Sequence, residues 1–138
     1  MAKILVVEDD EDIRDLVRLL LESDGHELHE AKSGEEGVAQ AKAVRPDLIL
    51  MDLSLAGTID GLESTRRLRA DADFDRTPII ALTAHAMLGD RERSLRAGCD
   101  EHWTKPIGNL REFKEMVERV AAEGRDAAAI ADRTHEQI

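Results

Sequence analysis

Several residue patterns are missing or scarce in this sequence, and each absence excludes a class of protein. A single cysteine among 138 residues cannot form an internal disulfide, which is typical of chains in a reducing cytoplasm. The longest apolar runs, such as 4–7 and 48–51, are far shorter than the ~20 residues of a membrane-spanning helix. The N-terminus lacks the hydrophobic stretch of a signal peptide, and Lys and Arg form no block that would suit nucleic acid. We therefore expect a cytoplasmic protein that neither enters a membrane nor binds nucleic acid directly.

Negative charge is what the chain has in excess. It contains 19 Lys and Arg against 30 Asp and Glu, a formal net charge of −11. Residues 1–60 alone hold 6 basic and 15 acidic residues, and five of these acids form the run 8–12. Such a run is either a solvated face or a cation site, and the order of the predicted elements decides between the two.

Short apolar runs alternate along the chain with segments of helical periodicity. Residues 3–8, 47–52 and 77–83 predict strands buried on both faces, 26–30 a polar edge strand, and 99–103 a short last strand. Apolar residues at helical spacing predict helices over 13–21, 33–45, 62–68, 87–97 and 110–120. We expect one domain over residues 1–123, and a loose tail or one short helix over residues 124–138.

The alternation of strands and helices predicts an α/β fold with a parallel sheet. Right-handed crossovers place helices on both faces and make the sheet doubly wound. In such a sheet, ligands bind at the carboxyl ends of the strands, where the strand order reverses. The residues that end the predicted strands are therefore the candidates for function.

Charged and hydroxyl side chains stand at these strand ends. Glu8 and Asp9 follow the first strand, Asp52 and Thr83 end two others, and Lys105 follows the last. Clustered carboxylates repel one another and resist ionisation unless a cation is present, and Mg²⁺ suits carboxylates together with phosphate oxygens. Thr83 and Lys105 add a hydroxyl group and a positive charge that can hold an anion. The set predicts a site for phosphoryl transfer to a carboxylate.

Four motifs at these strand ends resemble the response-regulator receiver domain of two-component signalling, in its single-domain, chemotaxis-type form. The motifs are Ile4-Leu-Val-Val-Glu-Asp-Asp10, Asp47-Leu-Ile-Leu-Met-Asp52, Pro78-Ile-Ile-Ala-Leu-Thr-Ala84 and Thr104-Lys-Pro-Ile107. The similarity extends over residues 3–123. It implies a flavodoxin-like, five-stranded parallel sheet of order 2-1-3-4-5 with helices on both faces.

The resemblance also implies a role for each acidic residue. Asp52 would be the phosphoacceptor, and Glu8 and Asp9 would bind Mg²⁺ together with Asp52 and the backbone carbonyl of Ser54. The phosphoryl group would come from a histidine kinase or a histidine phosphotransfer protein, or from a small acyl phosphate. The downstream target would be another protein, whose identity the sequence does not reveal.

Around the phosphoryl group, the resemblance implies that Thr83 donates a hydrogen bond and that Lys105 neutralises charge. Ala84 is small and leaves room for the group. His85, like Ser54, would flank the path of attacking water and tune the lifetime of the phosphoryl group. His102 stands three residues before the lysine, where the family usually has Tyr or Phe, and would be a pH-sensitive switch.

The loop after the acceptor also departs from the family pattern. Ala56 stands where the family commonly has proline, and Asp60-Gly61 comes one residue later than usual. We expect metal binding to survive this change and the partner surface to differ. That surface is expected around His102, Arg91 and Arg111.

The predicted function is that of a stand-alone receiver that signals through protein contacts and is not an enzyme acting on separate substrates. Two alternatives share its fold: an intermediate in a phosphorelay, and a receiver-like module that is never phosphorylated. A third is an aspartate-nucleophile phosphatase. It is disfavoured because such enzymes generally have a second acid two residues after the nucleophile, where this chain has Ser54.

Overall fold

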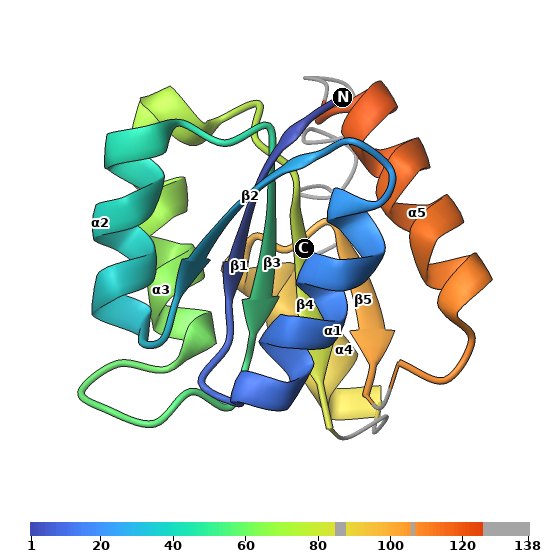
Figure 1. The fold of residues 1–138 in the computed structure, drawn as a ribbon. Coiled ribbons are helices and arrows are strands. Elements are labelled where there is room, and N and C mark those ends of the chain that lie inside the picture. The colour runs from blue at the N-terminus through green and yellow to red at the C-terminus, as the bar shows by residue number, and fades with distance from the viewer. Residues whose placement is uncertain (85–87, 106, 126–138) are drawn as a thin grey trace.

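The computed structural model describes residues 1–84, 88–105 and 107–125, and within these residues five parallel strands form one sheet (Figure 1). The strands are β1 (Lys3–Val7), β2 (Glu27–Ala31), β3 (Leu48–Asp52), β4 (Ile79–Thr83) and β5 (Glu101–Thr104). Their order across the sheet is β2-β1-β3-β4-β5, and every neighbouring pair is parallel. The predicted doubly wound α/β fold, its strand order and the edge position of β2 are confirmed.

Helices cover both faces of this sheet. They are α1 (Glu11–Glu22), α2 (Gly34–Val44), α3 (Gly61–Arg69), α4 (Leu88–Ala97) and α5 (Leu110–Glu123), with a short 3₁₀ turn, η1 (Ala72–Phe74). Helices α1 and α5 lie on one face, and α2, α3 and α4 lie on the other (Figure 1). No helix in the described ranges is long and apolar enough to span a membrane.

Alternate residues of each strand face opposite layers of the core. Ile4 and Val6 of β1 pack with α1 and α5 in a cluster that contains Phe113. Leu5 and Val7 of β1 pack in a second cluster, on the side of α2 and α3. Because both faces are buried, the central strands read in the sequence as continuous apolar runs.

Two strands begin two residues later than the sequence pattern predicts. The backbone N–H of Thr77 donates to the carbonyl of Phe74 over 3.1 Å, and this turn delays β4 to residue 79. The N–H of Cys99 donates to the carbonyl of Ser94 over 2.9 Å at the end of α4, which shifts β5 to 101–104. The turn η1 has no counterpart among the predicted elements. The other elements lie close to their predicted bounds.

The chain after α5 is tied back to the domain by Arg125. Its Nε donates to Oδ1 of Asp100 over 2.7 Å, and both side chains are only 10% exposed. Asp100 also accepts hydrogen bonds from Nη2 of Arg69, over 2.8 Å, and from the backbone N–H of Ile79, over 2.9 Å. Arg125, which we assigned to the tail, is therefore packed against the domain. The rest of the predicted tail, residues 126–138, lies outside the described residues.

Candidate functional site

The candidate site lies where the topology predicts, at the carboxyl ends of the central strands. Glu8 and Asp9 directly follow β1, Asp52 and Thr83 are the last residues of β3 and β4, and Lys105 directly follows β5. The strands on either side of β1 are β2 and β3, so the chain reverses its direction of winding at this point. Four strands thereby bring these five residues together at the carboxyl end of the sheet.

The three acidic residues form a cluster that can hold a cation. One carboxylate oxygen from each of Glu8, Asp9 and Asp52 lies within 4.8 Å of the others. Glu8 and Asp52 are buried, with 0% and 1% of their surface exposed, whereas Asp9 is exposed. A donor set of three carboxylates, one of them open to solvent, fits a hard divalent cation that keeps some of its waters.

Lys105 supplies the positive charge of the cluster. Its Nζ lies 2.8 Å from Oε1 of Glu8 and 3.3 Å from Oδ1 of Asp52. Burial favours the neutral amine, but the hydrogen bond to Glu8 and the charge of Asp52 outweigh it and raise the pKa of Lys105. The ammonium group is therefore charged at neutral pH and lies next to Asp52, the predicted phosphoacceptor.

The pKa values of the two carboxylates beside Asp52 are shifted in opposite directions. Burial, and then the hydrogen bond with Asp52, raise the pKa of Glu8 to about 7, although Lys105 acts against this shift. For Asp9, burial also acts upward, but hydrogen bonds led by the Ala56 N–H, 3.2 Å away, outweigh it and lower the pKa. Near neutral pH Glu8 is therefore partly protonated, whereas Asp9 is ionised, as expected when one of two neighbouring carboxylates is buried and the other is stabilised by hydrogen bonds.

Backbone amide groups orient these carboxylates. The N–H of Asp10 donates to Oε2 of Glu8 over 3.1 Å, and the N–H of Ser54 donates to Oδ1 of Asp52 over 3.0 Å. Asp10 is also the N-cap of α1, where its Oδ1 accepts the N–H groups of Asp12 and Ile13. Asp10 thus caps α1, while Glu8 and Asp9, the two residues before it, face the site.

Two further residues support the site, although the sequence analysis did not assign them to it. Nη1 of Arg14, a buried side chain in α1, donates to the backbone carbonyl of Glu8 over 2.8 Å. Gly61 begins α3, and a Cβ at this position would lie 2.0 Å from the carbonyl oxygen of Asp52. The sequence signals were an arginine on the buried side of the first helix, and a glycine directly after the capping residue Asp60.

The residues predicted to tune the site occupy different surroundings. Ser54 and Ala84 are exposed just after β3 and β4, respectively. His102 is half-buried in β5, in register with Ala81. Its neighbour Trp103 faces the opposite side of the sheet, and its ring meets that of Phe113 edge-on at a centroid distance of 5.4 Å. His85 lies outside the described residues.

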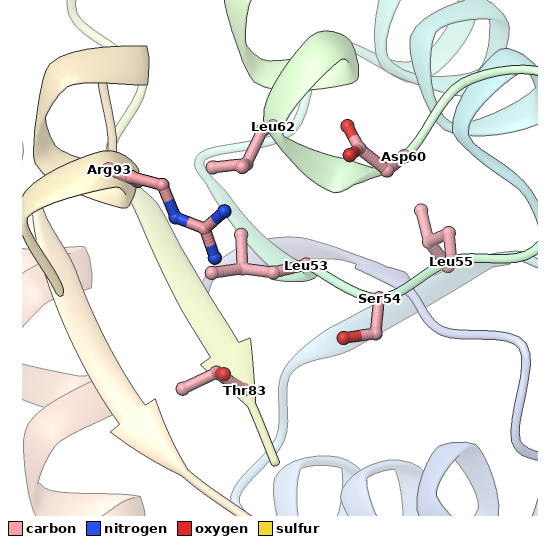
Figure 2. A pocket seen from close by; sticks show the side chains of 7 residues that line it. All are labelled: Leu53, Ser54, Leu55, Asp60, Leu62, Thr83 and Arg93. Carbon is pink, nitrogen blue, oxygen red and sulfur yellow. The ribbon is translucent and has the colours of Figure 1, made fainter. Parts of the chain in front are cut away.

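A pocket of about 350 Å³ opens at the carboxyl ends of β3 and β4 (Figure 2). Its residues come from the loop after β3, from the start of α3, from the end of β4 and from α4. They are Leu53, Ser54, Leu55, Asp60, Leu62, Thr83 and Arg93. Thr83 lines this pocket, and its backbone carbonyl accepts the N–H of Lys105 over 2.6 Å.

The fold and the site together describe a parallel α/β domain with a carboxylate and lysine cluster at its switch point. The family model of the response regulator receiver domain matches residues 4–121, and the chain belongs to this family. Proteins of this family act in two-component signal transduction.

Individual relatives and solved structures agree with this assignment. The polar-differentiation response regulator DivK of Brucella anthropi is 42% identical over 104 residues, which cover 75% of this chain and 84% of the relative. The receiver domain of a Pseudomonas aeruginosa sensor histidine kinase, solved with a magnesium ion in its active-site cleft, is 36% identical. The match covers 88% of this chain and 98% of that receiver domain, with a TM-score of 0.80. The chemotaxis protein CheY4 of Vibrio cholerae also has a TM-score of 0.80, at 29% identity over 87% of this chain and 98% of its own.

Proposed function

We propose that this chain is a receiver that accepts a phosphoryl group on Asp52, in a Mg²⁺-dependent reaction, from a histidine kinase or histidine phosphotransfer protein. It then signals through contact with a protein target. The observation that carries this proposal is the position of Lys105, whose Nζ lies between the buried carboxylates of Glu8 and Asp52. Positive charge is thereby held where a phosphoryl group on Asp52 would add negative charge.

The acidic cluster is the proposed seat of the metal ion. Glu8, Asp9 and Asp52 present carboxylate oxygens within 4.8 Å of one another, and the backbone carbonyl of Ser54 would be the fourth protein ligand. When bound, Mg²⁺ would offset the charge of the carboxylates and of the phosphoryl oxygens. The magnesium in the cleft of the Pseudomonas aeruginosa receiver domain supports this assignment.

The contacts of Asp52 indicate which of its oxygens reacts. Oδ1 accepts the Ser54 N–H and faces Lys105, so we assign the attack on phosphorus to Oδ2. As the bond from Oδ2 to phosphorus forms, the bond from phosphorus to the donor's histidine nitrogen breaks, and that nitrogen keeps the electron pair. The fixed Ser54 N–H prevents the carboxylate from rotating during this step, so the acceptor is preorganised.

After transfer, Thr83 and Lys105 are the groups that respond. The phosphoryl group adds about −1.5 to −2 of charge and new acceptor oxygens. The Lys105 ammonium group would turn towards this charge, and the Thr83 hydroxyl would donate to a phosphoryl oxygen. Because Thr83 joins β4 to the segment before α4, its movement would shift the population of states of the α4–β5–α5 face. We assign the target surface to this face, around Arg91, His102 and Arg111.

Intact-protein mass spectrometry tests the acceptor directly. Wild-type protein, Asp52→Asn and Asp47→Asn are each incubated with Mg²⁺ and a small phosphodonor, and again with excess chelator. Asp47 is the matched control, because it lies just before β3, at the end opposite Asp52, where its carboxylate accepts the Lys3 N–H. The proposal requires one added phosphoryl group in the wild type and in Asp47→Asn, none in Asp52→Asn, and none without metal. Addition to Asp52→Asn would overturn the choice of acceptor.

A further inference from the structure

The loop between β3 and α3, residues 53–60, orients two of the three carboxylates of the acidic cluster. The backbone N–H of Ser54 donates to Oδ1 of Asp52 over 3.0 Å. The N–H of Ala56 donates to Oδ2 of Asp9 over 3.2 Å, and a proline at this position would lack that donor. The position of the loop therefore bears directly on the proposed metal site.

The middle of this loop has little intrinsic rigidity. Ala56, Gly57 and Thr58 are all exposed, and Gly57 takes a φ of +115°, in the region that favours glycine. A glycine in an exposed loop leaves the chain many alternative conformations. The position of the Ala56 N–H therefore depends on what holds the far end of the loop.

The far end is held by the first turn of α2, and Figure 1 shows the loop passing below the start of this helix on its way to α3. Oε1 of Glu35 accepts the N–H of Ile59 over 3.0 Å, across 24 positions of the chain. The Ile59 side chain is buried, and a Cβ on Gly34 would lie 2.7 Å from its Cγ1. One hydrogen bond and one close packing contact thus join the loop to α2.

Glu35 is well placed to act as this tether. It lies in the first turn of α2, where the helix dipole stabilises negative charge. Hydrogen bonds from its own N–H and from that of Ile59 lower its pKa, although burial acts against them, and the hydroxyl groups of Ser33 and Thr58 lower the pKa further. The carboxylate is therefore ionised at neutral pH and is a strong hydrogen-bond acceptor for the loop.

We propose that Glu35 is a positioning residue for the metal site, because it holds the loop so that the Ala56 N–H stays against Asp9. The inference rests on the proposed function, since it concerns the binding of Mg²⁺ at the same cluster. Without the tether, the loop would have to be ordered when the cation binds, and this ordering would cost affinity. Once the metal site is saturated, the loop is ordered in either case, so the rate of phosphoryl transfer should change little.

Mg²⁺ titrations of the wild type, Glu35→Ala, Glu35→Gln and Glu36→Ala, followed by NMR, test the inference. The rate of phosphorylation by a small phosphodonor is measured at saturating Mg²⁺, and exchange of the Ala56 and Ile59 amide hydrogens is measured in chelator. Glu35→Gln keeps a side-chain oxygen that can accept the Ile59 N–H. Glu36→Ala is the matched control, because it removes the same charge from an exposed position in the same turn. Thermal unfolding of each variant reports on the fold.

Groups that hold a metal ligand directly typically change metal affinity by about 10–100-fold, and Glu35 acts one step further away. We therefore expect Glu35→Ala to weaken Mg²⁺ binding by about threefold to tenfold, and to change the rate at saturating Mg²⁺ by less than about twofold. It should also speed exchange of the two loop amides. Glu35→Gln should recover most of the affinity, and Glu36→Ala should behave as the wild type.

The variants and the wild type separate the possible failures. An equal loss of affinity in Glu35→Ala, Glu35→Gln and Glu36→Ala would be an effect of charge alone and would overturn the inference. Unchanged affinity in Glu35→Ala, or a global loss of stability in it, would also overturn the inference and leave the proposed function standing. A wild type that binds no Mg²⁺, and gains no phosphoryl group from a small donor or a phosphorylated histidine phosphotransfer protein, would overturn both.

Discussion

The ammonium group of Lys105 lies 2.8 Å from the buried carboxylate of Glu8, although 97 positions separate the two residues in the chain. The same ammonium group lies 3.3 Å from Asp52, so one cation bridges two carboxylates. This pairing explains how two buried acids can stand side by side at the end of a hydrophobic sheet. It also means that a metal ion at the acidic cluster shares its ligands with Lys105.

Replacing Lys105 by methionine should therefore weaken the fold and strengthen metal binding. Without the ammonium group, Glu8 and Asp52 are left as unpaired buried acids, and we expect the free energy of unfolding to fall by about 2–4 kcal/mol at neutral pH. Because a competing cation has been removed, Mg²⁺ should bind several-fold more tightly. Urea unfolding and a Mg²⁺ titration followed by Trp103 fluorescence measure the two effects.

The control for this variant is Lys114→Met. Lys114 also forms an ion pair, over 3.0 Å with Asp24, but both side chains are partly exposed to solvent. Its replacement should cost less than about 1 kcal/mol and leave Mg²⁺ affinity unchanged. Equal effects of the two substitutions would show that the position of Lys105 in the cluster is unimportant.

The raised pKa of Glu8 predicts how stability depends on pH. Its pKa is about 7 in the folded protein against an ordinary value of 4.5, so the folded state keeps a proton that the unfolded state releases. The contribution of Glu8 to stability is therefore fully present below about pH 4.5 and is lost as the pH rises through 7. In chelator, Glu8→Gln should gain stability relative to the wild type, by a few kcal/mol, between pH 5 and pH 8.

Added Mg²⁺ should stabilise the wild type more than Glu8→Gln at high pH. Ionised Glu8 is a ligand, whereas protonated Glu8 and glutamine are poor ones, so metal binding should strengthen as the pH rises through 7. Thermal unfolding at pH 5.5 and pH 8, with chelator and with Mg²⁺, measures all four conditions. A stability difference between wild type and Glu8→Gln that is independent of pH in chelator would contradict the raised pKa.

Gly61 is predicted to be essential for the geometry of the acceptor. An alanine Cβ there would lie 2.0 Å from the carbonyl oxygen of Asp52, a backbone atom that cannot move without displacing the end of β3. We expect Gly61→Ala to destabilise the fold by about 2–4 kcal/mol and to slow phosphorylation. Gly89→Ala is the control, because a Cβ there would contact nothing within 4 Å and Gly89 lies within α4. That variant should be as stable as the wild type or more so, by up to about 1 kcal/mol.

The contacts of Arg125 predict that this residue stabilises the domain. A chain that stops at Gly124 loses the pairing of Arg125 with Asp100 and with the carbonyl of Asp75, while the pairing of Asp100 with Arg69 is retained. We expect this truncation to cost about 1–3 kcal/mol. A chain that stops at Arg125 is the matched control, and we expect it to be more stable than the chain that stops at Gly124 by this amount. Both truncated chains should be phosphorylated at the wild-type rate, because Asp100 lies at the opposite end of the sheet from Asp52.

Local patterns in the sequence were sufficient to predict the five strands and the five helices, and to single out the residues that the fold brings together at the candidate site. Burial of the central strands on both faces appears in the sequence as continuous apolar runs, and helices appear as apolar residues at helical spacing. Asp52 and Thr83 are recognisable because each ends such a run. Sequence bounds were least accurate for β4 and β5, because turns at Thr77 and Cys99 set their first residues through hydrogen bonds to residues 74 and 94.

Only the tertiary structure decided which of these groups touch, and which residues support them. The Lys105–Glu8 contact, the Arg14 hydrogen bond and the approach of Gly61 to Asp52 depend on how distant segments pack, and no periodicity in the sequence records such distances. Arg93 and Arg125 illustrate the same limit, since each is one arginine among many until the fold places it beside Thr83 or Asp100. Secondary structure follows from neighbours within about four residues, whereas a site at a switch point follows from strand order and from the paths of the loops.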